Sequence, residues 1–196
     1  MNVFTSMKKM FVACMMLVAS MNMMASTVAE VVAAGAQDNA STSGTVVATY
    51  ARGFLISDGT GYILTYLGSD SGLAIGDVVT VSGTTSMYGG LLQFASGSTF
   101  EKTGTAEVTQ PEPEVLDGAA LDAYLDAPSI KYVQYTGTLN ISGYYYNVNV
   151  DGASTAVGSI QYPAEGLVDA TLHGKKIVVT GYSIGVSGTK YVNTMG

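Results

Sequence analysis

The residues Gly76–Gly83 read GDVVTVSG, and the residues Gly174–Gly181 read GKKIVVTG. In both stretches two glycines bracket a short run rich in β-branched side chains, which predicts a strand that begins and ends at tight bends. The two stretches lie 98 positions apart, and Gly90 has a counterpart in Gly188 at the same spacing. The chain is therefore predicted to contain two copies of one β unit.

The composition agrees with a folded β protein. Of the 196 residues, 47% are hydrophobic and only 12% are charged, which is too apolar for a disordered chain. The sequence contains 24 Gly and 13 Tyr together with many Val and Thr, and these branched and aromatic side chains fit a pleated, half-buried surface. We expect an all-β protein. Its net charge of −7 disfavours polyanionic partners unless basic residues cluster locally.

The N-terminal region has the pattern of a secretory signal peptide. Lys8 and Lys9 precede an apolar run over residues 10–19 that is too short to span a bilayer. Ala34–Ala36 satisfies the Ala-x-Ala cleavage pattern, and Ala25 and Ala29 are earlier candidates. We assign residues 1–36 to the signal peptide, with the cleavage site somewhere within 25–36. The mature protein is then expected to be secreted, periplasmic or in the cell envelope, with no membrane span.

The first copy is predicted to follow a flexible lead-in at residues 37–43 and to cover residues 44–109. Five strands are expected there, with Gly53 marking a bend in the first: 45–56, 62–67, 77–82, 91–95 and 99–109. Residues 110–116 include Gln110-Pro111-Glu112-Pro113-Glu114, which cannot donate freely to a β ladder. We therefore predict a linker at residues 110–116.

The second copy is predicted over residues 117–196 and opens with a short helix. Asp117 is the expected N-cap, and Leu121, Tyr124 and Leu125 fall on one apolar face that would close the end of a barrel. Asp151-Gly152 then repeats Asp58-Gly59 at a spacing of 93 rather than 98. The difference predicts an insertion of about five residues near 162–165.

The aligned halves share an opening Gly-Thr, an Asp-Gly turn, an aromatic strand and the Gly-bracketed strand. This pattern resembles the OB-fold modules of secreted bacterial proteins, of the kind that accompany extracellular nucleases. The resemblance implies two tandem five-stranded OB-like Greek-key barrels with one short helix between them. It also implies binding of oligonucleotides or oligosaccharides across the face of strands 2 and 3.

Seven residues are candidates for such a binding face. Aromatic side chains on one face of a strand can stack on bases or sugar rings, and adjacent lysines can neutralise a phosphate. The alternatives are that the tyrosines merely cover the barrels and that the lysines form a solvated strand edge. The candidates are Tyr62, Tyr66, Tyr88, Tyr144, Tyr146, Lys175 and Lys176.

Catalytic and metal chemistry have little support in the sequence. His173 is the only histidine, and no Gly-x-Ser-x-Gly elbow accompanies it. Asp58, Asp70 and Asp77 lie near turns but match no calcium-binding loop, so we predict no metal site and no cofactor. A hydrolase would have to depend on His173.

We therefore expect a non-enzymatic binding module whose ligand is a single-stranded nucleic acid or a glycan strand. The alternative is a protein-interaction or scaffold module that engages a protein partner in a cell-envelope assembly.

Overall fold

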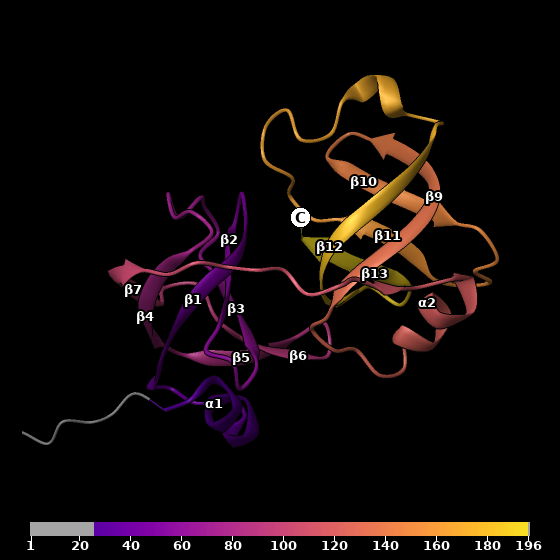
Figure 1. The fold of residues 1–196 in the computed structure, drawn as a ribbon. Coiled ribbons are helices and arrows are strands. Elements are labelled where there is room, and N and C mark those ends of the chain that lie inside the picture. The colour runs from indigo at the N-terminus through magenta and orange to yellow at the C-terminus, as the bar shows by residue number, and fades with distance from the viewer. Residues whose placement is uncertain (1–25, 196) are drawn as a thin grey trace, which may run out of the picture.

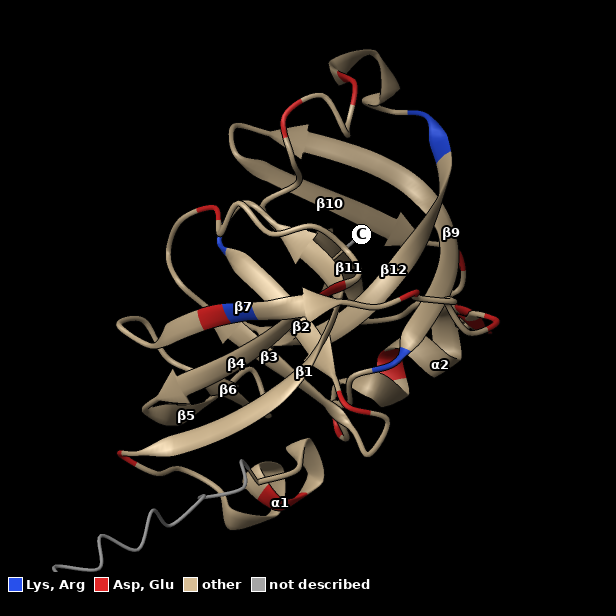
Figure 2. Cartoon of the chain, turned by 60° about the vertical axis from the view of Figure 1, so that its left-hand side comes forward, with Lys and Arg blue, Asp and Glu red and all other residues tan. Residues whose placement is uncertain are grey.

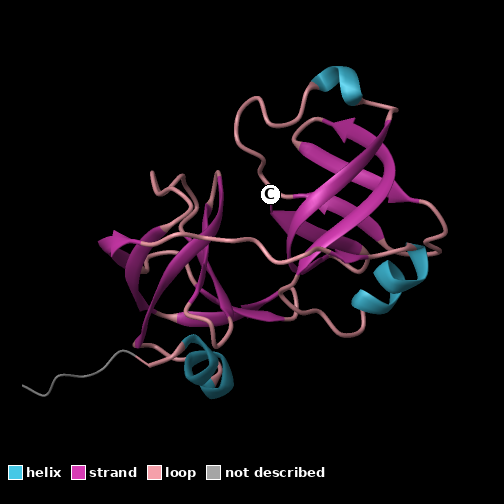
Figure 3. Ribbon diagram, in the orientation of Figure 1, coloured by secondary structure: helices cyan, strands magenta, loops and turns pink. Residues whose placement is uncertain are grey.

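The computed structural model describes residues 26–195, which form two β-sheet halves packed side by side, each with a short α-helix (Figure 1, Figure 3). None of the helices in this range is long and apolar enough to cross a membrane. The all-β prediction is confirmed at this level, since strands make up most of the ordered structure.

The first half contains one seven-stranded sheet. Its elements are α1 (Val28–Ala34), β1 (Ala40–Tyr50), β2 (Gly53–Ser57), β3 (Tyr62–Tyr66), β4 (Asp77–Gly83), β5 (Thr85–Tyr88), β6 (Leu91–Phe94) and β7 (Thr99–Thr105). The strand order is β5-β6-β3-β2-β1-β4-β7, and β3 and β6 run parallel. Only Thr84 separates β4 from β5, so the sheet curls round a core that includes Phe54 and Phe94.

The second half is a closed five-stranded barrel. Its elements are β8 (Glu114–Val115), α2 (Gly118–Tyr124), β9 (Tyr132–Ser142), β10 (Tyr145–Val150), β11 (Val157–Ile160), a 3₁₀ turn (Ala170–Leu172), β12 (Lys176–Ser187) and β13 (Tyr191–Met195). The order is β10-β11-β13-β12-β9, with β10 pairing back onto β9 and β8 lying outside the ring. Strands β11 and β13 are parallel.

The two Gly-bracketed stretches form strands, and their alternate residues face the cores as predicted. The predicted end at Gly181 is wrong, because Gly181 pairs with Val133 of β9 and β12 continues to Ser187. Val79 and Val81 of β4 are completely buried, and Val179 of β12 is nearly so. Ile177 is half-buried and packs against the second core. In β4 buried residues alternate with half-buried or exposed ones, which is the period of two expected for a strand with one face on a core.

The first half differs from the prediction at its N-terminal end. Residues 40–43 are strand rather than a flexible lead-in, because Ala40 and Thr42 are buried and pair with β4. Residues 26–36, assigned above to the signal peptide, belong to the folded unit as well. Helix α1 starts with a capping box of Thr27 and Glu30, and it buries Val28 and Val31 in the first core. The basic and apolar part of the predicted signal peptide, residues 1–25, lies outside the described residues.

The predicted long strand 45–56 is a hairpin of β1 and β2 instead. The chain turns at Ala51 and Arg52, and Gly53 follows with a φ of 149°. A Cβ atom on Gly53 would lie 2.0 Å from the carbonyl oxygen of Thr65 on β3, so only glycine allows this close approach. The turn therefore creates an extra strand, and β7, predicted as the fifth barrel strand, is the outer edge of the sheet.

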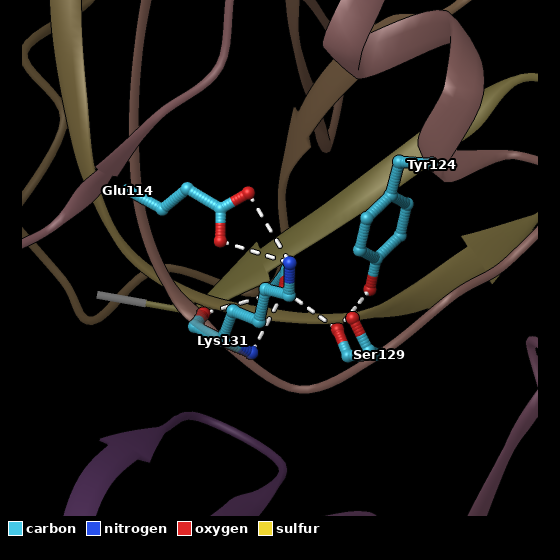
Figure 4. A network of polar contacts seen from close by, with 5 residues as sticks. Glu114, Tyr124, Ser129 and Lys131 are labelled. Atoms are coloured by element: carbon cyan, nitrogen blue, oxygen red, sulfur yellow. Dashed lines mark hydrogen bonds and ion pairs between the residues drawn. The ribbon is translucent and has the colours of Figure 1, made fainter.

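Helix α2 confirms its prediction. Asp117 is the N-cap and accepts a hydrogen bond from the amide of Ala120, while Leu121 and Tyr124 are buried in the second core. The Tyr124 hydroxyl donates to the carbonyl oxygen of Ser129 at 2.6 Å (Figure 4). The same hydroxyl accepts from the amide of Gly185, so it ties the loop before β9 to β12. Nearby, Lys131 pairs with Glu114 at 2.8 Å, joining β8 to the start of β9 (Figure 4).

The predicted linker at residues 110–116 does not hold the halves apart. Gln110 donates to the carbonyl oxygen of Val47 in the first half at 2.9 Å and accepts from the Tyr182 hydroxyl in the second at 2.7 Å. The Tyr182 ring lies 5.3 Å from that of Tyr62 and 5.0 Å from that of Tyr132. A shared apolar cluster surrounds these rings, so the two halves pack as one body.

Candidate ligand-binding cleft

A cleft of about 210 Å³ lies between the two halves. The first half contributes side chains from β1, β3, β5 and β6, and the second half contributes side chains from the loop that follows β11, from β12 and from β13. Its lining is aromatic, aliphatic and amide in character: Tyr50, Leu64, Tyr66, Tyr88, Gln93, Gln161, Tyr162, Ile184 and Asn193. None of these residues carries a formal charge at neutral pH.

Four tyrosines give the cleft its aromatic character. The rings of Tyr50 and Tyr162 come from different halves and lie 6.4 Å apart at an interplanar angle of 50°. Burial raises the pKa of Tyr50 well above its ordinary value, and the neighbouring phenols of Tyr66, Tyr162 and Tyr88 raise it further. The Tyr50 hydroxyl therefore stays protonated and can donate a hydrogen bond at any physiological pH.

Tyr162 is held in an unusual backbone conformation at the edge of the cleft. Its φ is 40°, and it is the one non-glycine residue with a positive φ in the described range 26–195. Such a conformation costs on the order of 1–3 kcal/mol, so other contacts must hold it. The Arg52 guanidinium lies 4.9 Å from the centre of the Tyr162 ring, and the Ala51 amide donates to the Tyr162 carbonyl oxygen at 3.1 Å.

The amide side chains form an ordered polar wall. Gln161 Nε2 donates to Asn193 Oδ1 at 2.9 Å and to Ser159 Oγ at 3.0 Å. Ser187 Oγ donates to the same Asn193 oxygen at 2.9 Å. Across residues 26–195, no hydrogen bond engages the Asn193 amide nitrogen or the Gln93 side chain, so both are available to a ligand.

The structure divides the seven predicted residues. Tyr66 and Tyr88 line the cleft, while Tyr62 packs against Tyr182 in the contact between the halves. The other four lie on the second barrel and outside the cleft, so the seven do not form one site.

Those four are placed as follows. Tyr144 lies in the β9–β10 turn and is 93% exposed, and Tyr146 packs against the second core instead of facing a ligand. Lys175 and Lys176 lie where β12 begins, and Lys176 pairs with Asp151. Figure 2 shows the Lys and Arg residues of the described chain on separate strands and loops, so this pair is not part of a larger basic cluster among residues 26–195.

The acidic residues considered for a metal have structural partners. Asp58 accepts the amide of Val28 at 2.9 Å, which anchors the start of α1, and its pKa is lowered by hydrogen bonds that outweigh partial desolvation. Asp77 pairs with Lys102 at 2.6 Å. His173 Nδ1 accepts the amide of Ile141. Within the described part of the chain, no three His, Cys, Asp or Glu residues are grouped to hold a metal ion.

Seven of the nine residues that line the cleft were missed by the sequence reasoning: the aliphatic Leu64 and Ile184, and the polar or aromatic Tyr50, Gln93, Gln161, Tyr162 and Asn193. The one signal for them was the insertion predicted near 162–165, which contains Tyr162. No family model matches this chain, and no curated protein matches it in sequence.

Proposed function

We propose that this protein is a secreted, non-catalytic binding protein of two OB-like barrels, and that the cleft between them binds a glycan strand. An OB-fold is a five-stranded Greek-key barrel, and the strand number and closed order of the second half support that assignment. The first half supports the same assignment because a strand pair in its sheet matches a strand pair in the second half. Gly44 pairs with Val79 in the first sheet, and Gly137, which is 93 positions later, pairs with Ile177, which is 98 positions later.

The observation that carries the ligand class is the uncharged lining of tyrosines and amides. A sugar presents C–H faces that pack on aromatic rings and hydroxyls that bond to amide groups, whereas a nucleic acid strand requires cationic groups along its phosphates. The cleft offers the first kind of surface. The Arg52 guanidinium lies over the Tyr162 ring, 4.9 Å from its centre, and Arg52 does not itself line the cleft. The cleft volume of about 210 Å³ suits one ring of a chain lying across it, since drug-sized ligands occupy about 300–1,000 Å³.

Secretion is part of the same proposal and rests on the pattern of residues 1–25. Of the three cleavage positions considered, Ala25 alone leaves α1 intact, because Ala29 and Ala34–Ala36 fall within or just after the helix. We therefore place the mature N-terminus at Ser26.

The test is a titration of the protein with neutral oligosaccharides and with single-stranded oligonucleotides, each at low and high salt. Oligosaccharide affinity is expected to be independent of salt and to fall at least about fivefold in Tyr66→Ala, an estimate from about 1–3 kcal/mol for an aromatic stacking contact. Tyr144→Ala is the matched control, because that ring is outside the cleft and 93% exposed. Oligonucleotide binding that weakens steeply with salt, without oligosaccharide binding, would replace the proposal with a nucleic acid ligand.

A further inference from the structure

Along the first part of β12, residues 176–181, one edge of the strand has no strand neighbour among residues 26–195. Residues 176–181 of this strand pair with β9 on one side only, because β13 pairs further along, with residues 182–187. The corresponding strand of the first half, β4, pairs on both sides: β1 covers one edge and β7 covers the other (Figure 1).

The 98-residue spacing relates the two edges residue by residue. β7 pairs with Val79, Thr80, Val81 and Ser82 of β4 through Lys102, Glu101, Phe100 and Thr99. The counterparts of those four β4 residues are Ile177, Val178, Val179 and Thr180. The free edge is therefore the place that β7 fills in the first half.

A groove runs along this edge. It has a volume of about 410 Å³ and is lined by those four β12 residues together with Leu167, Val168 and Leu172 from the segment that precedes β12. Val178 is 60% exposed, whereas its counterpart Thr80 is half-buried beside β7. A Cβ added to Gly76 would meet the carbonyl oxygen of Ala106 at 2.7 Å, but a Cβ added to Gly174 would meet nothing within 4 Å.

β7 shows which side chains such a guest strand needs. Phe100 packs against the first core, with its ring 5.2 Å from that of Phe54. Two residues later, Lys102 pairs with Asp77 at 2.6 Å. In the second half the counterpart of Asp77 is Lys175, so the charge is reversed, and Lys175 makes no ion pair with any described residue.

We propose that the edge of β12 binds an extended peptide segment of another polypeptide, antiparallel to β12, in the position that β7 holds on β4. Main-chain hydrogen bonds to an open sheet edge supply affinity, and side-chain pockets supply specificity. The guest places an apolar side chain in the groove and, two residues later, an Asp or Glu beside Lys175. This peptide site is separate from the cleft between the halves.

The probe is a synthetic peptide with the sequence of residues 98–106 in which Lys102 is replaced by Glu; the unchanged peptide is its control. The readout is the movement of the backbone amide NMR signals of residues 177–180 during titration of the full chain. The Glu peptide is expected to saturate these shifts and to bind about two- to fivefold more tightly than the Lys peptide, the range for one exposed ion pair. Lys175→Glu should reverse that preference.

Leu167→Glu is expected to abolish binding of the Glu peptide because it places a carboxylate in the apolar wall. Ile75→Glu should leave binding unchanged, since Ile75 has a nearly equal exposure of 54% against 53% for Leu167 and does not line the groove. Absence of shifts at residues 177–180 with either peptide, or equal affinity for both, would overturn the proposal. Self-association that protects these amides without peptide would overturn it as well and assign the edge to a second copy.

Discussion

The substitution Val31→Ala tests whether α1 belongs to the first half. Val31 is 2% exposed and packs in the core beside Val28, whereas the adjacent Val32 is 43% exposed on the outer side of the same helix. The two valines thus differ in burial but share one short helix. Val32→Ala is the matched control.

Only Val31→Ala is expected to destabilise the protein. Val31→Ala removes two buried methylene equivalents, a loss of about 1.6 kcal/mol that grows if the space left behind does not collapse. Alanine favours the helix by about 0.5 kcal/mol relative to valine, so the net loss is about 1–2 kcal/mol. Val32→Ala changes only the intrinsic helix propensity at an exposed position and should be neutral or stabilising by a few tenths of a kcal/mol.

The assay is thermal or urea unfolding of the purified proteins, and the Val31→Ala loss corresponds to a fall in Tm of about 2–8 °C for a chain of this size. Equal Tm values for the two variants would refute the docked position of α1. That result would also remove the reason for placing the mature N-terminus at Ser26.

Three further predictions concern the second half and its contact with the first. Tyr182→Phe removes the 2.7 Å hydrogen bond to Gln110 and should lower the free energy of unfolding, measured by urea titration, by about 0.5–1.5 kcal/mol. An unchanged free energy of unfolding would mean that this bond does not help to join the halves. Gly118→Ala puts a Cβ 2.0 Å from the amide nitrogen of Ala153 and should lower the free energy of unfolding by at least about 1–3 kcal/mol. The control Gly104→Ala has open space around the new Cβ and should change Tm little, so similar Tm values for the two variants would contradict the tight docking of α2. Hydrogen bonds from the amides of Ala156 and Ser154, then from the Ser154 hydroxyl and the Thr155 amide, hold the pKa of Asp122 well below its usual value. This carboxylate therefore stabilises the fold above about pH 4 and does so progressively less as the pH falls below that value. The loss of unfolding free energy through Asp122→Asn should shrink between pH 7 and pH 2, and a loss that stays constant over this range would contradict the assignment.

The duplicated β unit could be predicted because its determinants are local. Gly76, Gly83 and Gly174 mark bends at or near the ends of β4 and β12, and the alternation along β4 marks which of its side chains face the core. The start of α2 was predicted for the same reason, since an Asp N-cap and an apolar helical face lie within nine residues, 117–125. Each of these signals is contained in a short stretch of chain.

Helix α1 was missed because its composition is ambiguous. VAEVVAA lies a few residues after the apolar, signal-like run 10–19, and small residues suit both a cleavage region and a short helix. The distinguishing signal was the Thr27-x-x-Glu30 capping box, which begins a helix. The turn at Ala51 and Arg52 lacked a comparable signal, so β1 and β2 were merged.

The cleft was only partly predictable because it depends on how the halves pack. Tyr66 and Tyr88 were chosen as aromatic residues of one barrel, and they do line it. Tyr50 and Tyr162 are 112 residues apart and meet only because the tyrosines around Tyr182 join the halves. No pattern in the sequence predicts that Asn193 and Gln161 lie together.

The most direct test of the cleft as the ligand site is an NMR titration that follows side-chain amide signals during addition of an oligosaccharide. The proposed site predicts that the amides of Gln93, Gln161 and Asn193 shift together and saturate at the same ligand concentration, because all three line the cleft. Shifts confined to the region of Tyr144 and Lys175, with these three amides unchanged, would contradict it.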